Sequence, residues 1–276
     1  SIVLCDALGQ EEDLNYICCH HEQSVAFAAE GYARANKSIG ICLVTTGPGG
    51  TNALTGVAAS WIDSIPMIVI SGQVFSKQTI GKTNLRQLGV QESDVVSLAS
   101  SITKYSKMIT NANDILYELQ KCYSIATDGR KGPVWLDIPA DIQNSTIDVK
   151  NLKKFNSNKK RQNLKTKQLD HIIDKIVKCK RPIIHVGHGV KLSNSQTELL
   201  KLIEKTKIPV MTTWNATDVV PANFDFFIGR PGAFSERGPN FHIQNCDLYI
   251  SIGTRLPYMV PGYNKSDFAR NSYKIM

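Results

Sequence analysis

The chain has 276 residues, of which 42% are hydrophobic and 20% charged, a balance typical of soluble globular proteins and sufficient for two domains. Its longest apolar runs are too short to cross a bilayer and no secretory signal is recognisable, so we expect no membrane association. The seven cysteines form no C-x-x-C pair, and most lie in apolar segments. This pattern favours a reduced, cytoplasmic protein without disulfides or a zinc site.

The net charge of +8 has a local origin. Eight Lys or Arg residues and no acid lie between Lys150 and Lys167, whereas basic and acidic residues balance in the rest of the chain. Phe155 is the only aromatic residue in this stretch, and no nucleic-acid-binding motif follows it. A solvated linker is therefore favoured over a nucleic-acid arm, and we expect no nucleic-acid partner.

A helix of small residues is predicted to begin at Glu22. Ala26, Ala29 and Ala33 recur at helical spacing, so one face can approach another backbone closely. The acid in the first turn either complements the helix dipole or is a buried carboxylate held against a cofactor. These residues alone favour the helix-dipole interpretation, with the cofactor contact as the alternative. The preceding histidines, His20 and His21, are predicted to end a strand.

The part of the chain from 41 to 141 has an α/β pattern. Continuous apolar runs predict strands at 39–46, 65–72 and 132–139, and helices are predicted at 51–64 and 113–129, with Gly129 at the end of the second. This order implies a parallel sheet covered on both faces.

A second α/β unit is predicted after the basic segment. Its helices are expected at 168–179 and 193–207, and its strands at 181–189, 208–214, 246–253 and 272–276. Two overlapping capping boxes, Ser193 with Gln196 and Ser195 with Glu198, are expected to start the second helix. We therefore predict a domain at 1–147, a linker at 148–166 and a second domain at 167–276. Because the last strand reaches the final residue, we expect the chain to be a fragment.

Two glycine-rich turns follow predicted strands. "GPGGTN" at 47–52 and Gly187-His188-Gly189 could each bind a phosphate at a helix N-terminus, or each could be a tight turn. The six histidines show no metal-ligand spacing, so no metal ligand is predicted in this chain.

Taken together, these segments resemble one family. The resemblance is carried by "YICCHHEQSVAFAAEGYARANKSIGICLVTTGPGGTNALTGVAASWIDSIPMIVISGQV", "QESDVVSLASSITKYSKMI", "GPVWLDIPADIQ" and "CDLYISIGTRL". They are similar to the pyrimidine-binding and central domains of thiamine-diphosphate enzymes, most of all acetohydroxyacid (acetolactate) synthases. The implied fold is a parallel-sheet α/β domain followed by a truncated Rossmann-like α/β domain.

The resemblance implies roles for residues of the first domain. Glu22 corresponds to the glutamate that bonds to N1′ of the aminopyrimidine ring and makes the 4′-nitrogen a base, for which a partly desolvated carboxylate with a raised pKa would be suitable. The turn lining that ring corresponds to Gly47, Pro48, Gly49 and Asn52. Gln91 matches a glutamine near the reacting centre and completes the predicted catalytic pair with Glu22.

The resemblance also implies a flavin site in the central domain. FAD would be bound by residues at positions matching the family, namely Gly187, Gly189, Thr213, Arg230, Arg237, Asn240 and Arg255. Three departures leave the flavin and the second substrate open: Ser235 stands where relatives commonly have glycine, Val90 where they have phenylalanine, and the loop at 75–90 is longer than usual.

The family holds the diphosphate and Mg²⁺ through a G-D-G motif and a following asparagine, which this sequence does not contain. Mg²⁺ ligands are therefore expected on a further domain, and the active site between subunits of a homo-oligomer. The implied reaction decarboxylates pyruvate and joins the product to a second 2-keto acid, as in branched-chain amino acid synthesis. Pyruvate oxidase, 2-hydroxyacyl-CoA lyase, oxalyl-CoA decarboxylase and a non-catalytic nucleotide- or partner-binding module remain alternatives.

Overall fold

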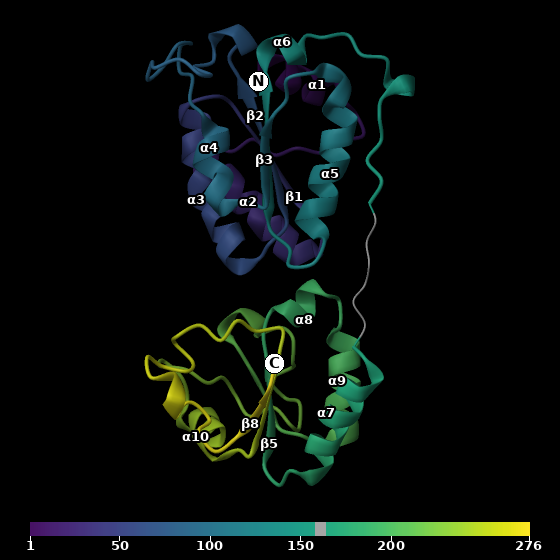
Figure 1. The fold of residues 1–276 in the computed structure, drawn as a ribbon, viewed down its shortest axis with the longest axis vertical. Helices are drawn as coiled ribbons and strands as arrows, with labels where there is room; N and C mark the ends of the chain where they lie inside the picture. The colour runs from purple at the N-terminus through teal and green to yellow at the C-terminus, as the bar shows by residue number, and fades with distance from the viewer. Residues whose placement is uncertain (158–163) are drawn as a thin grey trace. The chain divides into compact units, whose positions relative to one another are not determined.

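The computed structural model describes residues 1–157 and 164–276, which form two compact units separated between residues 160 and 161 (Figure 1). We call residues 1–157 the first unit and residues 164–276 the second unit. The middle of the predicted linker, 158–163, lies outside the described residues. The proposed domain limits at 147 and 167 stay predictions.

The first unit is built on a four-stranded sheet. Its strands are β1 (Gly40–Val44), β2 (Met67–Gln73), β3 (Tyr105–Met108) and β4 (Pro133–Pro139). Its helices are α1 (Ile2–Gln10), α2 (Glu22–Asn36), α3 (Pro48–Asp63), α4 (Val95–Ala99), α5 (Ile115–Thr127) and α6 (Ala140–Gln143). The strand order is β1-β2-β4-β3 and every pairing is parallel, which confirms the predicted parallel sheet.

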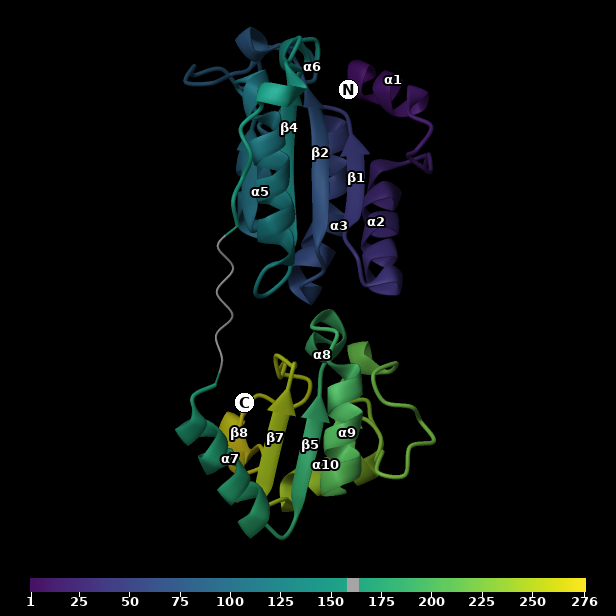
Figure 2. The ribbon, with the colours of Figure 1, turned by 90° about the vertical axis from the view of Figure 1, so that its right-hand side faces the viewer.

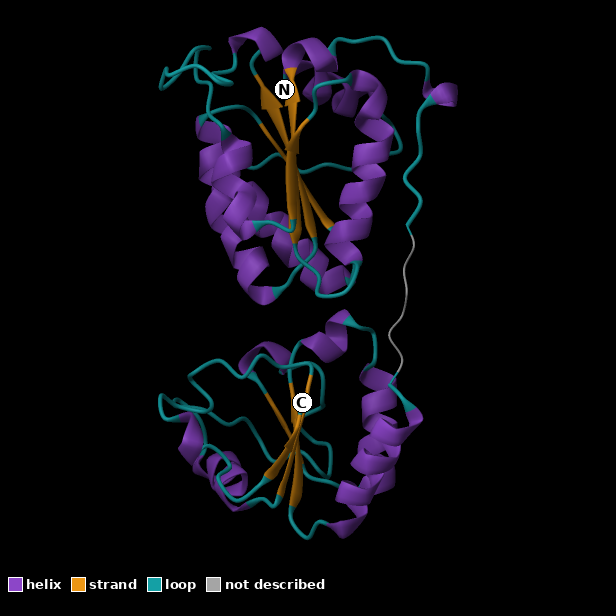
Figure 3. Ribbon diagram, in the orientation of Figure 1, coloured by secondary structure: helices purple, strands orange, loops and turns teal. Residues whose placement is uncertain are grey.

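Helices cover both faces of this sheet, as Figures 1 and 3 show. Because successive strand side chains point to opposite faces, Met67 and Val69 of β2 pack with α2, α3 and α4, whereas Ile68 packs with α5 on the other face. Trp135 of β4 is fully buried on the α3 side. This two-sided burial explains why β2 and β4 are continuous apolar runs.

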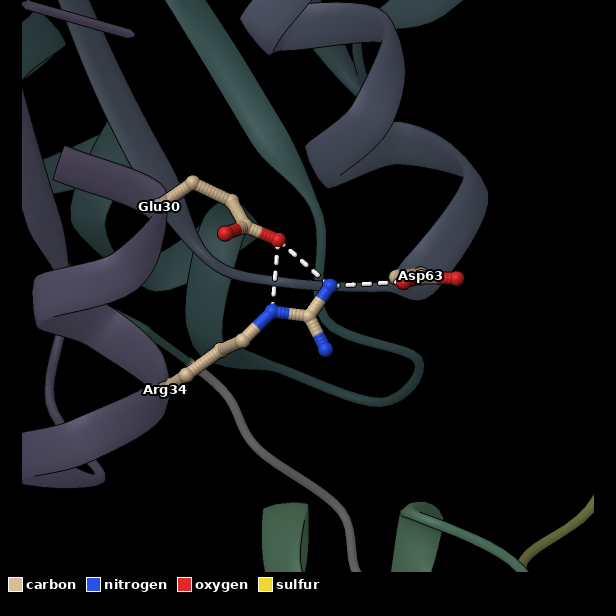
Figure 4. Close-up of polar contacts among 3 residues, drawn as sticks. All are labelled: Glu30, Arg34 and Asp63. Atoms are coloured by element: carbon tan, nitrogen blue, oxygen red, sulfur yellow. Dashed lines mark hydrogen bonds and ion pairs between the residues drawn. The ribbon is translucent and has the colours of Figure 1, made fainter. Parts of the chain in front are cut away.

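The alanine face of α2 packs against α3. Ala26, Ala29 and Ala33 are buried as predicted, and a Cβ at Gly56 of α3 would lie only 2.5 Å from the Cβ of Ala26. Nearer the C-terminal ends of the two helices, Arg34 Nε donates to Glu30 Oε1 at 2.6 Å and Arg34 Nη2 to Asp63 Oδ2 at 2.6 Å (Figure 4). Close packing and this ion pair together fix α2 relative to α3.

Two features of the first unit differ from the predictions. The segment before α2 is not a strand: His21 is the N-cap of α2, and its Nδ1 accepts a hydrogen bond from the Gln23 N–H at 3.1 Å. In addition, β3 and α4 lie within what was predicted as a long loop. β3 is an edge strand whose four residues are all half-buried, so it lacks the apolar run that marks the other strands.

The second unit repeats this architecture (Figures 1 and 2). Its helices are α7 (Thr166–Lys178), α8 (Gly189–Leu192), α9 (Gln196–Thr206) and α10 (Arg237–Asn245), and its strands are β5 (Pro182–Val186), β6 (Val210–Thr212), β7 (Leu248–Ile252) and β8 (Tyr273–Ile275). The parallel order is β6-β5-β7-β8. α7 and α9 pack on one face and α10, which was not predicted, on the other.

The start of α9 differs from the prediction. Ser195 is the N-cap of α9, but its hydroxyl makes no capping bond, and Gln196 Nε2 donates to the carbonyls of Asp218 and Val219 instead, so the capping boxes do not form. All seven cysteines are free, and Cys42, Cys122 and Cys246 are buried.

Candidate functional site

Six of the predicted site residues meet at one edge of the first unit's sheet. β1, β2 and β4 are parallel, so their carboxyl ends lie at the same edge, which is where ligands bind in open α/β sheets. The turn from β1 into α3 carries Gly47, Pro48 and Gly49 at this edge, and Asn52 follows in the first turns of α3.

Glu22 and Asn52 are in direct contact. Each stands near the start of its helix, and Asn52 Nδ2 donates to Glu22 Oε2 at 3.1 Å. The pKa of the Glu22 carboxyl is lowered, because this bond and a backbone N–H bond to the carboxylate outweigh its partial burial. The expectation of a raised pKa is therefore wrong for this chain: Asn52 stabilises the charged form more than burial destabilises it.

The glycines of the turn allow two functional groups to approach it closely. A Cβ at Gly49 would lie 2.8 Å from Thr45 Cγ2 and 3.6 Å from Glu22 Oε1. A Cβ at Gly47, where φ is +58°, would lie 2.1 Å from the carbonyl oxygen of Gln91. A larger residue at position 49 would therefore press on Thr45 beside Glu22, and one at position 47 would separate the turn from Gln91.

Gln91 lies in a folded loop between β2 and α4. Its side chain is exposed and its φ is +60°, and Val90 before it is 87% exposed. The next residue, Glu92, is buried and accepts hydrogen bonds from the backbone N–H groups of Ile80 at 2.8 Å and Leu88 at 3.2 Å. Glu92 thus organises the loop between β2 and α4, a role that the sequence analysis did not assign.

A buried polar network beneath this edge was also missed. Gln73 at the end of β2 and Asp137 in β4 are 4% and 1% exposed, and Gln73 Nε2 donates to Asp137 Oδ2 at 2.9 Å. Ser71 Oγ donates to Asp137 Oδ1 at 2.5 Å and accepts from Trp135 Nε1 at 2.8 Å. Burial raises the pKa of Asp137 to about 6. The sequence carries one sign of this network, namely polar residues within otherwise apolar strands: Ser71 and Gln73 in β2 and Asp137 in β4.

The glycines predicted to bind a nucleotide in the second unit fill a packing role. A Cβ at Gly187 would lie 2.3 Å from the Gly253 carbonyl oxygen, and one at Gly189 would lie 2.8 Å from the Gly253 Cα. The turn after β5 therefore needs glycine because the chain leaving β7 runs against it. Thr213, directly after β6, donates its N–H to the Val186 carbonyl at 2.8 Å.

The remaining predicted residues of the second unit have different environments. Asn240 of α10 bonds to both the N–H and the carbonyl of Gly232 and so holds the loop at 229–236. Arg230 in this loop has its guanidinium 5.5 Å from the centre of the Phe227 ring. Arg230 Nε and Ser235 Oγ are buried without a hydrogen-bond partner among the described residues. Arg237 and Arg255 are exposed.

Residues 1–157 and 164–276 contain neither a candidate metal centre nor a membrane-spanning helix. In these ranges no three His, Cys, Asp or Glu side chains are grouped so that they could hold a metal ion. None of the helices in the same ranges combines the length and apolar character needed to cross a membrane.

Comparisons with known proteins match both units. Residues 1–98 match the family model of the thiamine pyrophosphate enzyme N-terminal TPP binding domain, and residues 169–276 match that of the central domain. The first of these matches contains Glu22, the Gly47–Gly49 turn, Asn52 and Gln91.

Curated relatives of the chain include acetolactate synthase large subunits. The protein of Escherichia coli (strain K12), named isozyme 2 large subunit, is 33% identical over 90% of this chain and 44% of its own length. A probable large subunit of Methanococcus aeolicus is 37% identical over 97% of the chain and 44% of its own. That of Lactococcus lactis subsp. lactis (strain IL1403) is 32% identical over 98% and 46%.

The chain thus spans a little under half the length of the curated relatives it matches. Over that span both of its units match thiamine pyrophosphate enzyme domains, in the same order as the two parallel sheets of the structure. The chain belongs to the family of thiamine pyrophosphate enzymes.

Proposed function

We propose that the protein containing this chain is a thiamine-diphosphate-dependent acetolactate synthase, which decarboxylates pyruvate and joins the two-carbon product to a second 2-keto acid. The observation that carries the proposal is the placement of Glu22, which Asn52 holds beside the Gly47–Gly49 turn. The relatives named acetolactate synthase support the choice of reaction.

In this proposal Glu22 is the group that holds a proton at N1′ of the cofactor's pyrimidine ring. Thiamine diphosphate, when bound, supplies the carbon nucleophile that attacks the 2-keto acid. The lowered pKa keeps Glu22 ionised at neutral pH, and Asn52 fixes the direction of its carboxylate. Pro48 and the two glycines would line the ring, and Gln91 would contact the reacting substrate.

We assign Glu22 and Gln91 as catalytic residues and the turn residues as cofactor-binding residues. In the second unit, we propose that Arg230 and Ser235, whose buried polar atoms have no partner among the described residues, contact a bound FAD. Gly187, Gly189, Thr213, Arg237, Asn240 and Arg255 complete the proposed FAD site. We further propose that the protein binds Mg²⁺ through a diphosphate-binding domain, forms a homo-oligomer and is located in the cytoplasm.

The test is an assay of the full-length protein with pyruvate, thiamine diphosphate and Mg²⁺. We expect acetolactate formation, and we expect Glu22→Gln to lower turnover by about 10²–10⁴-fold, the usual range for a group that transfers a proton. Glu30→Gln is the matched control, because Glu30 lies on the same helix but pairs with Arg34 away from the turn. Unchanged turnover in Glu22→Gln would refute the assignment.

The same assay separates the related reactions. Acetolactate from pyruvate supports the synthase, acetate or acetyl phosphate would indicate an oxidase, and cleavage of a 2-hydroxyacyl-CoA would indicate a lyase. The choice of acceptor is proposed to lie in the loop that carries Val90, since this exposed residue directly precedes Gln91.

A further inference from the structure

We propose that Gln73, held in one orientation by Asp137, is a positioning residue that fixes the Gln91 segment against the turn after β1. The fixing of the Gln91 segment by Gln73 involves residues of this chain alone. Its effect on turnover rests on the proposed function. Gln73 is a positioning residue and not a catalytic one, because it is buried beneath the edge at which the substrate would bind.

The Gln73 amide joins two segments that are far apart in the sequence. Its Nε2 donates to the Ser93 carbonyl at 2.9 Å, two residues after Gln91. Its Oε1 accepts from the Thr46 hydroxyl at 2.5 Å, directly before Gly47. Gly47 in turn lies against the Gln91 carbonyl. One amide group therefore sets the spacing between the turn that would line the cofactor and the loop that carries Gln91.

Asp137 determines which way this amide points. An ionised carboxylate only accepts hydrogen bonds, so it selects the Nε2 side of Gln73 at 2.9 Å. The Oε1 atom is thereby directed to the Thr46 hydroxyl and the Val74 N–H, which donates at 3.0 Å. In the flipped orientation, Oε1 would face both the carboxylate and the Ser93 carbonyl, which are acceptors. Asp137 therefore excludes the orientation that would release Ser93.

The burial of Asp137 supports a role beyond stability. Its carboxyl is 1% exposed and has no cationic partner among the residues that the structure describes; its hydrogen bonds come from the neutral groups of Ser71 and Gln73. Such a carboxylate is costly to bury, as its raised pKa reflects. A hydrophobic residue would fill the same place in β4 at a lower cost but could not orient Gln73.

The experiment exchanges the amide and the carboxylate in the full-length protein. Gln73→Glu alone places two carboxylates together, and we expect a lower melting temperature. In the double variant Gln73→Glu/Asp137→Asn, the new amide at position 137 can donate to the new carboxylate at position 73 and accept from Ser71. The new carboxylate can still accept from Thr46 and the Val74 N–H. The donation to the Ser93 carbonyl is lost, and a carboxylate oxygen faces that carbonyl in its place, so this is the one contact of Gln73 that the exchange does not restore.

Two readouts decide the proposal. We expect the double variant to regain the melting temperature while the amides of residues 88–94 in the cofactor-free protein exchange about tenfold faster than in the wild type. With cofactor, we expect its kcat to stay about tenfold or more below wild type. The control is Ser71→Ala, which removes the other hydrogen bond to Asp137 and should lower stability without accelerating exchange at 88–94.

Several outcomes would overturn the inference. Wild-type exchange at 88–94 in the double variant would show that Gln73 does not hold this segment. A full return of kcat together with the melting temperature would show that the Ser93 bond has no part in turnover. Absence of pyruvate turnover in the wild type itself would instead refute the proposed function, while the exchange measurement would still decide whether Gln73 positions the loop.

Discussion

Asp137 provides a stability prediction that can be worked out quantitatively. Burial raises its pKa from 3.8 to about 6, the neighbouring acids Asp94 and Glu92 add to the shift, and the bonds from Ser71 and Gln73 oppose it. The folded protein therefore binds this proton more tightly than the unfolded chain. The stabilisation from this difference is fully present below about pH 3.8 and is lost as the pH rises through about 6.

The size of the effect follows from the shift of the pKa. A difference of about two units corresponds to about 3 kcal/mol between the protonated and ionised forms. Asp137→Asn removes the titration. Relative to wild type, the unfolding free energy of Asp137→Asn should therefore be about 2 kcal/mol higher at about pH 7.5 than at about pH 4.5, which means that the variant is relatively more stable at the higher pH.

The assay is hydrogen exchange of peptides from β2 and β4 in rising urea, which reports on the first unit within the full-length protein. Asp141→Asn is the control with the opposite sign. Burial raises the pKa of Asp141, but the N–H and hydroxyl of Ser76 donate to its carboxylate and lower the pKa overall. Its contribution to the unfolding free energy is therefore present above the ordinary pKa and lost in acid. A pH-independent difference for Asp137→Asn would refute the reasoning.

Three other perturbations have defined outcomes. Gly47→Ala should lower the unfolding free energy by more than the roughly 1–3 kcal/mol of a strained backbone conformation, since φ is +58° with ψ −116° and the new Cβ would meet the Gln91 carbonyl; calorimetry measures this. Arg34→Met should lower the unfolding free energy by about 1–3 kcal/mol, because Glu30 loses its ion-pair partner and Asp63 loses its bond from Arg34; faster exchange in α2 is the readout. His185 is buried and its pKa is lowered to about 4, so acidification from about pH 6.5 to about pH 4 should destabilise the second unit by about 3 kcal/mol. His185→Phe should remove that pH dependence in exchange measurements on β5, and its persistence would contradict the assignment.

The strands buried on both faces could be predicted from the sequence, because burial makes them continuous apolar runs. β3 could not be, since an edge strand of half-buried residues shows neither a run nor a clear alternation. The helix start at Glu22 was predicted correctly, but the strand before it was not, because the apolar residues Tyr16 and Ile17 are exposed in this chain.

Within the candidate site, the residues that resemble a family motif could be named in advance. The direction of the Glu22 pKa could not, because it depends on the contact with Asn52, thirty residues away. The same is true of Gln73 and Asp137, whose polar side chains meet only when β2 and β4 pair. Sequence patterns identify single positions, whereas charge states depend on pairs that the fold brings together.

The close contact of Gly56 with Ala26 has a consequence for how this site can change during evolution. Glu22 and Asn52 belong to two helices whose separation is set by that contact, so their geometry does not depend on the loop at 75–90. That loop is instead held by Glu92, which accepts a hydrogen bond from the Ile80 N–H. The residue after Glu92, Ser93, is held by Gln73. Insertions in the loop at 75–90 can therefore reshape the surroundings of Gln91 without moving Glu22. Under the proposed function, substrate preference and cofactor activation would therefore lie in separately variable parts of one sheet edge.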